Sequence, residues 1–288
     1  MNEEFLFSPE LQTLLGSILC DRISRACSGE LPEEIRLRAG SLPVIRSGGR
    51  EIGLEGACPE SRHLEEIVMR AVRYSAYSFE KPLKNGWLPL PGGGRLGICA
   101  TVTGEGFRDV SSLCIRLPRV YECLSRDEFR EIYPEGFQST LILSPPGYGK
   151  TTLLRSMIRR LSLSGFNVSV ADDRFEIAGS IRGKPAYDLG PRTDVLSGGC
   201  RSDGMMMLLR SMAPDVIACD EISSPEDGRA ALTISHLGVR LLATAHAESR
   251  EDFEKRELSR RMVASGVFRK YVLILLDKGK RKYHAGVF

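Results

Sequence analysis

The stretch "LILSPPGYGKTTLLRSM", Leu141 to Met157, decides the fold. An apolar run ends in two prolines and two glycines, and a helical pattern starts at Lys150. In a strand, turn and helix of this kind, successive backbone N–H groups point inward and the positive end of the helix dipole faces the same point. The stretch therefore predicts a phosphate-binding loop.

The spacing from Ser144 to Thr151 matches G-x-x-x-x-G-K-[ST], except that Ser144 replaces the first glycine. Proline has no N–H, so we expect the cradle to begin at Gly147. Lys150 is predicted to reach the β and γ oxygens of ATP, and the Thr151 hydroxyl to bind Mg²⁺. The alternative is a chance loop with a helix cap. The residues expected to bind the nucleotide are Pro146, Gly147, Tyr148, Gly149, Lys150, Thr151 and Thr152.

A hydrolytic nucleotide site also needs a carboxylate at the end of a second strand. The run "APDVIACDEI", Ala213 to Ile222, supplies Asp220, which is placed to hold Mg²⁺ through water. Glu221 follows and is placed to polarise the attacking water. An apolar run that ends in Asp-Glu is also a common strand exit, but its position after a phosphate loop favours the catalytic interpretation.

Polar side chains end two further predicted strands. Asp172 and Asp173 in "VSVADDRFEIAG" could order water or metal, although Asp-Asp after a strand is also an ordinary turn signal. Thr244 and His246 in "RLLATAHAES" end the other strand, where a polar group could sense the γ-phosphate. Taken alone, a histidine at a strand end is more often structural.

The N-terminal part of the chain has the pattern of a small α+β domain. Residues 34–52 alternate around a Gly-Gly turn and predict a hairpin, residues 61–79 predict a helix, and residues 88–119 return to strands and turns. A polar, turn-rich passage follows over residues 119–139. We place the domain boundary near residue 125.

From Thr140 onward, strands and helices alternate, which favours a mostly parallel sheet covered by helices on both faces. Residues 192–215 are interpreted as a glycine-rich loop followed by a helix that carries three consecutive methionines. We expect strands at residues 141–143, 167–171, 215–219 and 239–244, a helix at 150–163, and a closing hairpin at 271–288.

Composition excludes several classes of protein. With 42% hydrophobic and 27% charged residues in 288, the chain has the composition of an ordinary globular protein. A net charge of +3 neither implies nor excludes a nucleic-acid partner. No apolar run approaches the roughly 20 residues that span a bilayer, and the acidic start is unlike a signal peptide, so we expect a cytoplasmic protein. The 8 cysteines form no C-x-x-C pair and are expected to be reduced thiols.

Taken together, "SPPGYGKTTLLRSM", "ADDRFEIAG", "RTDVL", "GMMMLLRSMAPDVIACDEI" and "ATAH" resemble the stage III sporulation protein AA family, ATPases of endospore-forming bacteria. That family is similar to the hexameric ATPases of type II and type IV secretion and pilus assembly. The resemblance implies a RecA-like P-loop core at residues 126–288, with a mostly parallel α/β sheet, and a smaller α+β domain at 1–125.

The resemblance also assigns roles to single residues. Gly147 to Thr152 match the Walker A loop, and Asp220 with Glu221 match Walker B. Asp172, Asp173 and Glu176 look like the aspartate box, with Asp173 where its relatives are expected to carry Glu, and His246 looks like the histidine-box residue. Arg95 and Arg116 resemble the N-terminal-domain arginines that reach the nucleotide, although exposed arginines are common on strands.

We therefore expect an Mg-ATP-hydrolysing motor that powers a trans-envelope complex between mother cell and forespore. The resemblance implies a homo-oligomer, a hexamer, docked on an inner-membrane protein at the mother-cell side. We expect no nucleic-acid partner, because the net charge is mild and the sequence lacks an aromatic and basic platform. Two alternatives stay open. One is a nucleotide-gated scaffold with little turnover, and the other is a RecA-like nucleic-acid motor.

Overall fold

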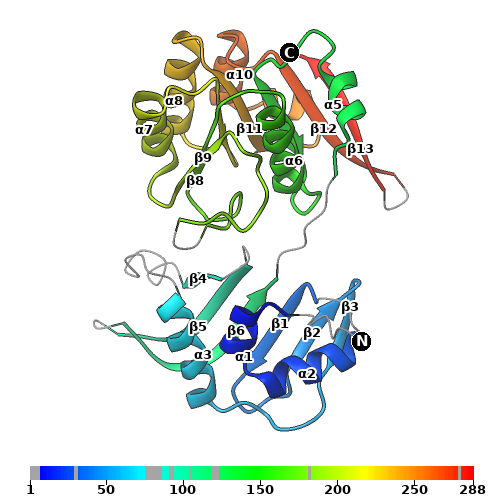
Figure 1. Cartoon of the computed structure of the whole chain (residues 1–288), viewed down its shortest axis with the longest axis vertical. Coiled ribbons are helices and arrows are strands. Elements are labelled where there is room, and N and C mark those ends of the chain that lie inside the picture. The colour runs from blue at the N-terminus through cyan, green and yellow to red at the C-terminus, as the bar shows by residue number, and fades with distance from the viewer. Residues whose placement is uncertain are drawn as a thin grey trace. The chain divides into compact units, whose positions relative to one another are not determined.

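The computed structural model describes residues 7–28, 32–74, 86–90, 94–103, 106–117, 123–180, 183–277 and 280–288. The chain divides into two compact units, each shown in Figure 1. The first unit comprises Met1–Arg119 with Gly179–Ala186, and the second comprises Val120–Ala178 with Tyr187–Phe288. Each unit has its own sheet and its own apolar core.

The first unit is built on a 6-stranded sheet in the order β3-β2-β1-β6-β5-β4, in which every pair is antiparallel. Its strands are β1 (Glu34–Arg38), β2 (Val44–Ser47), β3 (Arg50–Gly53), β4 (Trp87–Leu90), β5 (Gly94–Thr103) and β6 (Gly106–Arg116). Its helices are α1 (Pro9–Leu15), α2 (Ser17–Ala26) and α3 (Ser61–Tyr74). The hairpin expected over residues 34–52 is present, and Gly48 and Gly49 turn β2 into β3 with positive φ.

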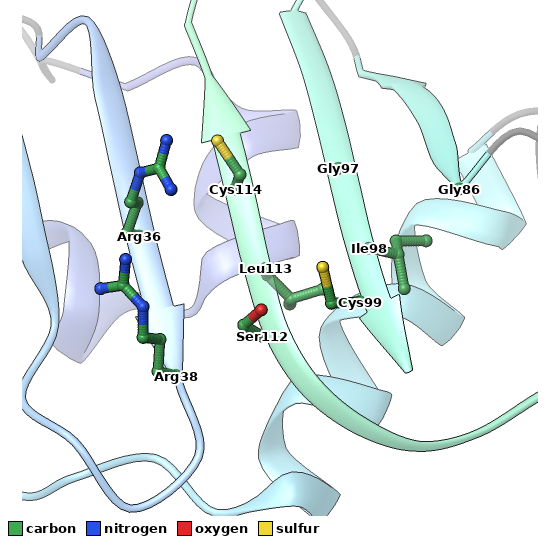
Figure 2. Close-up of a pocket in the computed structure, with 9 residues that line it drawn as sticks. All are labelled: Arg36, Arg38, Gly86, Gly97, Ile98, Cys99, Ser112, Leu113 and Cys114. Carbon is green, nitrogen blue, oxygen red and sulfur yellow. The ribbon is translucent and has the colours of Figure 1, made fainter. Parts of the chain in front are cut away.

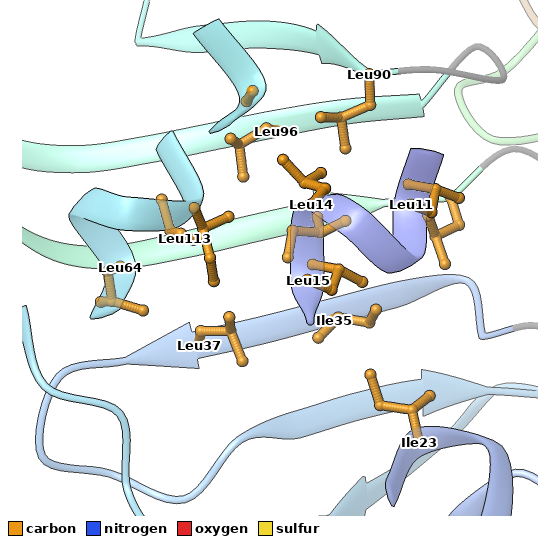
Figure 3. Packing of buried hydrophobic residues seen from close by; sticks show 14 of the residues in the cluster. Leu11, Leu14, Leu15, Ile23, Ile35, Leu37, Leu64, Leu90, Leu96 and Leu113 are labelled. Atoms are coloured by element: carbon orange, nitrogen blue, oxygen red, sulfur yellow. The ribbon is translucent and has the colours of Figure 1, made fainter. Parts of the chain in front are cut away.

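One face of this sheet is apolar because side chains alternate along each strand. Ile35 and Leu37 of β1 are buried, and they pack with residues of α1, α2 and α3 in a single cluster. Figure 3 shows Leu14 of α1 and Leu64 of α3 among these residues. The helices of the first unit thus cover the face that carries the odd-numbered residues of β1.

The even-numbered residues of β1 lie on the opposite face, beside a pocket of about 210 Å³ (Figure 2). Arg36 and Arg38 flank the pocket on the β1 side. Cys114 of β6 stands opposite Arg36 in the ladder, and Gly97 of β5 stands opposite Cys114. Because Gly97 and Cys114 have small side chains or none, they leave space for the pocket, and Arg36 and Arg38 line its β1 side.

The second unit is built on a 7-stranded sheet in the order β13-β12-β7-β11-β10-β8-β9. Every pair is parallel except β12 with β13, so the predicted mostly parallel α/β sheet is confirmed. The strands are β7 (Thr140–Ser144), β8 (Val168–Asp172), β9 (Thr193–Ser197), β10 (Val216–Cys219), β11 (Arg240–His246), β12 (Lys270–Asp277) and β13 (Lys280–Val287). The helices are α5 (Arg126–Ile132), α6 (Lys150–Leu163), α7 (Arg201–Ser211), α8 (Pro225–His236), α9 (Arg250–Glu254) and α10 (Glu257–Ala264).

Helices cover both faces of this sheet, which explains why its central strands are apolar throughout. Ile142 of β7 packs with residues of α5 and α6 on one face, and Leu141 and Leu143 pack with residues of α7 and α8 on the other. Within the described ranges, none of the helices combines the length and apolarity that a membrane crossing requires.

Two elements differ from the sequence prediction. Strand β9 lies in the stretch interpreted as a loop. Its residues are all half-buried because it pairs with β8 at the sheet edge, and its sequence TDVLS shows no alternation of apolar and polar residues. Helix α5 lies in the passage interpreted as turns. It begins with a capping box between Ser125 and Glu128 and buries Phe129 and Ile132.

The predicted helix at residues 61–79 is present through Tyr74, and residues 75–79 lie outside the described part.

Gly228 in α8 provides a test of the packing between α8 and α10. A Cβ at Gly228 would overlap the Cδ1 atom of Leu258. We expect Gly228→Ala to lower the free energy of unfolding by about 1 to 2 kcal/mol, because overpacking outweighs the gain of about 1 kcal/mol in helix propensity. Urea unfolding of Gly228→Ala, Leu258→Ala and the double variant measures this. In the Leu258→Ala background the Gly228→Ala substitution should become stabilising. A stabilising effect in the wild-type background would contradict the packing argument.

Candidate active site

The candidate site lies where four neighbouring strands end, at the carboxyl edge of the parallel sheet (Figure 1). The order β7-β11-β10-β8 and the parallel register bring the last residues of these strands together. Ser144 pairs with His246, and Cys219, which precedes Asp220, pairs with Ala243 and Ala171. Ligands of open α/β sheets bind at this edge, so the fold gathers the predicted residues where such a site is expected.

The predicted loop joins β7 to α6 in the expected way. Gly147 has φ of 80° and Gly149 has φ of 97°, a region that glycine enters without strain, and Gly149 is the N-cap residue of α6. Ser144 keeps a negative φ, so this position does not need the glycine of the motif. The 14-residue helix α6 begins at Lys150 and directs the positive end of its dipole toward the loop.

Lys150 is buried, and its ammonium is held by several acceptors. The Nζ atom donates to the Ser144 carbonyl at 3.1 Å and to the Pro145 carbonyl at 3.2 Å. It also lies 2.8 Å from the Nδ1 atom of His246. Burial lowers the pKa of Lys150, while the negative charges of Asp220 and Glu221 oppose that shift. The lysine thus lies at the centre of the edge, in contact with β7 and β11.

The contact with Lys150 fixes the tautomer of His246. An ammonium group can only donate, so Nδ1 of His246 must accept and the ring proton must lie on Nε2. Nε2 is 3.5 Å from the Oε1 atom of Glu221. Lys150, His246 and Glu221 therefore form a continuous polar chain across the strand ends.

Asp220 and Thr151 are joined directly. The Thr151 hydroxyl donates to Oδ2 of Asp220 at 2.7 Å, and the Thr244 hydroxyl donates to Oδ1. A hydroxyl and a carboxylate are oxygen ligands of the kind that Mg²⁺ takes from a protein, the other positions being filled by phosphate and water. The residues at this position therefore fit a magnesium ion.

Glu221 has a left-handed backbone, with φ of 52°, which is uncommon for a residue with a side chain. Its N–H donates to the Thr244 hydroxyl at 2.9 Å, so Thr244 orients Asp220 and Glu221 together. Its Oε2 atom lies 2.7 Å from Nη1 of Arg174, which follows the aspartate pair. The carboxylate is thus placed between Arg174 and His246.

The two aspartates after β8 have different surroundings. Asp172 is buried and accepts from the backbone N–H groups of Glu176, Ile177 and Ala178 at 2.8 to 3.0 Å, so it shapes the turn that contains Glu176. Asp173 lies 2.9 Å from Nη2 of Arg201. The catalytic role predicted for Asp173 therefore stays a prediction, and the structure pairs its carboxylate with an arginine.

Arg95 and Arg116 stand opposite each other on β5 and β6 in the first unit. The guanidinium of Arg95 lies 4.2 Å from the centroid of the Trp87 ring, and Nε of Arg116 lies 3.2 Å from Glu34. Both belong to the sheet of the first unit and not to the sheet that carries the phosphate loop. Their predicted contact with the nucleotide stays a prediction.

Three further arginines contact the site and were not predicted from the sequence: Arg174, Arg201 and Arg281. Arg281 of β13 donates to the Tyr148 carbonyl at 2.9 Å, and its Nε atom lies 2.9 Å from the place a Cβ on Gly149 would occupy. Gly149 is therefore favoured by its φ, and a Cβ at this position would also displace the end of the Arg281 side chain. No local motif marks Arg281, which lies in a run of basic residues in the closing hairpin.

Comparison with known proteins identifies the family. The family model described as "Sporulation stage III, protein AA" matches residues 12–288. Stage III sporulation protein AA of Bacillus subtilis is 35% identical over 283 residues, which cover 92% of this chain and 91% of that protein. The chain belongs to the sporulation stage III protein AA family. The resemblance inferred from the motifs is thereby confirmed.

The relationships to secretion ATPases are more distant. The type II secretion system ATPase E of Vibrio cholerae is 23% identical over 235 residues, which cover 82% of this chain and 38% of that protein. The structure of the ATPase DotB of Legionella pneumophila superposes with a TM-score of 0.62 at 15% identity, covering 93% of this chain and 79% of that one. The chain thus shares its fold with the ATPase DotB and is distantly related in sequence to a type II secretion system ATPase.

The buried Asp172 predicts a pH dependence of stability. Burial raises the pKa of its carboxyl from an ordinary 3.8 to about 6, although three backbone N–H donors oppose the shift. Because the pKa is higher in the folded chain, the contribution of Asp172 to stability is present below about pH 4 and is lost as the pH rises through about 6. Relative to Asp172→Asn, the wild type should lose about 2 to 3 kcal/mol between pH 4 and pH 7. Urea unfolding of both proteins across this range measures it, and a difference that stays constant or grows with pH would refute it.

Proposed function

We propose that this protein is a motor that hydrolyses Mg-ATP at the carboxyl edge of the second sheet. The observation that carries the proposal is the polar chain from Lys150 through His246 to Glu221, beside the Thr151–Asp220 pair. A phosphate loop, a magnesium-binding pair and a carboxylate for the attacking water are the parts that phosphoryl transfer to water needs. The phosphate loop and Thr151 follow β7, Asp220 and Glu221 follow β10, and His246 ends β11.

In this proposal the backbone N–H groups from Gly147 to Thr152 hold the phosphates, as does the Lys150 ammonium. Thr151 and Asp220 would hold the magnesium ion, which neutralises charge that develops on the phosphate oxygens. Glu221 orients the attacking water and accepts its proton. Lys150 is buried at this edge.

His246 connects phosphate binding to the catalytic carboxylate. Its Nδ1 atom accepts from Lys150 and its Nε2 atom faces Glu221, so phosphate oxygens that draw the lysine ammonium toward them also act on the imidazole. Movement of the ring then changes its contact with Glu221. We therefore propose that phosphate binding changes the position of Glu221 through His246.

At the level of the assembly, we propose a hexamer of this chain docked on an inner-membrane protein at the mother-cell side. There it powers a complex that spans the envelope between mother cell and forespore. The smaller domain at residues 1–125 would move against the RecA-like domain at 126–288, and Arg95 and Arg116 would act on the γ-phosphate. Membership of the sporulation family and distant homology to secretion ATPases support this proposal.

Steady-state ATP hydrolysis by wild type, Lys150→Ala and Glu221→Gln tests the proposed chemistry. Lys150→Ala should lose both ATP binding and turnover. Glu221→Gln should retain ATP binding but lose about 100-fold or more in kcat, because general-base catalysis contributes about that much. Glu257→Gln and Lys255→Ala, which change exposed residues of α10 and the α9 C-cap, are matched controls and should remain at the wild-type rate.

The alternatives give different results in the same experiment. Turnover by Glu221→Gln at the wild-type rate would contradict the assigned base. A wild type that binds ATP and assembles with it but does not turn it over, with Glu221→Gln assembling equally well, would favour the nucleotide-gated scaffold. Salt-dependent retention on single-stranded DNA would favour the nucleic-acid motor.

A further inference from the structure

Arg201, the first residue of α7, lies buried behind the catalytic edge. Its guanidinium joins segments that are far apart in the sequence. Nη1 donates to the Glu221 carbonyl at 2.6 Å and to Oδ2 of Asp227 at 3.1 Å, and Nη2 donates to Asp173 at 2.9 Å. One side chain thus links the turn after β8, the turn after β10 and the N-terminus of α8.

The contact with the Glu221 carbonyl completes a clamp on that residue's backbone. Thr244 accepts from the N–H of Glu221 at 2.9 Å, and Arg201 donates to its C=O at 2.6 Å. These groups belong to the peptide units on either side of the Glu221 Cα atom. Fixing both peptide units fixes φ and ψ between them, and φ is held at 52°.

The direction of the Glu221 side chain depends on this clamp. A residue with a Cβ atom prefers negative φ, so a Glu221 backbone released from one side would be expected to leave the left-handed region. Its carboxylate would then move away from His246 and from the Thr151–Asp220 pair. We propose that Arg201 is a positioning residue for the proposed ATPase reaction, holding the Glu221 backbone so that the carboxylate faces the attacking water.

The contacts of Arg201 are not those of an arginine placed for stability alone. Its Nε atom is buried and has no hydrogen-bond partner among the described residues, which is unfavourable for stability. Asp227 already accepts from the backbone N–H groups of Ser223 and Ser224 and caps α8 with Ser224. Helix α8 therefore retains its cap without the arginine.

The proposal rests on the proposed function and is tested by a double-mutant cycle in ATP hydrolysis. Arg201→Met should lower kcat by about 10- to 100-fold and change KM for ATP by less than about 3-fold, because the phosphate loop is untouched. In the Glu221→Gln background the same substitution should have no further effect on kcat, since Arg201 acts through Glu221. Arg210→Met, on the exposed side of the same helix, is the matched control and should behave as wild type.

Arg201→Lys separates positioning from folding. It keeps the buried positive charge opposite Asp173 and Asp227, but a single ammonium on a shorter side chain cannot make all the contacts of the guanidinium fork. We expect a wild-type melting temperature with a kcat closer to that of Arg201→Met than to wild type. If Arg201→Met does not fold, Arg201→Lys carries the test in its place. Wild-type kcat in Arg201→Lys and Arg201→Met, or losses that multiply with Glu221→Gln, would overturn the proposal.

A structural measurement decides the matter without ATP turnover. In a crystal structure of Arg201→Lys, or of Arg201→Met, Glu221 should have left the left-handed region, with its carboxylate displaced from His246. Retention of φ near its wild-type value would refute the clamp. Because this result does not depend on hydrolysis, an inactive wild type would count against the proposed function and leave the clamp to be judged by this measurement.

Discussion

The parallel register of β7, β11, β10 and β8 is the constraint on which the site depends. Each strand ends in a polar residue or directly before one, and the register decides which of these residues become neighbours. Cys219 pairs with Ala243, so Asp220 and Thr244 follow as the next residues of adjacent strands. A slip of one residue would turn Thr244 to the other face and separate it from Asp220. The geometry of the candidate site therefore depends on the pairing of the strands more than on any single loop.

The same sheet limits where polar groups can stand. Its central strands are buried on both faces, so a polar side chain within them is unfavourable unless it has a partner inside the protein, and Ser169 of β8 has none among the described residues. Thr244 is fully buried and meets this condition by donating to Asp220 and accepting from the Glu221 N–H. The middle of β7, by contrast, is apolar, as Leu141, Ile142 and Leu143 show. The polar side chains of the candidate site are therefore concentrated at the carboxyl edge of the sheet.

The sequence predicts those parts of the site that depend on local spacing. The glycines of the phosphate loop, Lys150 and Thr151 are adjacent in the chain, and Asp220 with Glu221 end an apolar run, so both groups could be located before the structure. The capping box of α5 was also present in the sequence, at Ser125 and Glu128, although the passage was interpreted as turns. Local patterns are informative because the residues concerned act within one turn or one strand.

Arg174, Arg201 and Arg281 could not be predicted in this way. Arg281 contacts the phosphate loop from a position 133 residues away, and Arg174 lies 47 residues from Glu221. The partner of an arginine side chain depends on the tertiary fold. The sequence around an arginine after a turn, or in a basic hairpin, does not indicate which residue it will contact. Strand β9 was missed for a related reason, because an edge strand of half-buried residues has no periodic pattern.

The backbone conformation of Glu221 depends on contacts from several parts of the second unit. The positive φ of Glu221 is unfavourable by itself, and it persists because the surrounding contacts determine it more strongly than the residue's own preference. Those contacts come from β11 through Thr244 and from α7 through Arg201, which also binds the turn after β8 and the start of α8. A displacement of any of these elements must therefore change the forces on the Glu221 backbone. The position of the proposed base is thus coupled to α7, to the start of α8 and to the turn after β8, as well as to β11, which also contacts Lys150.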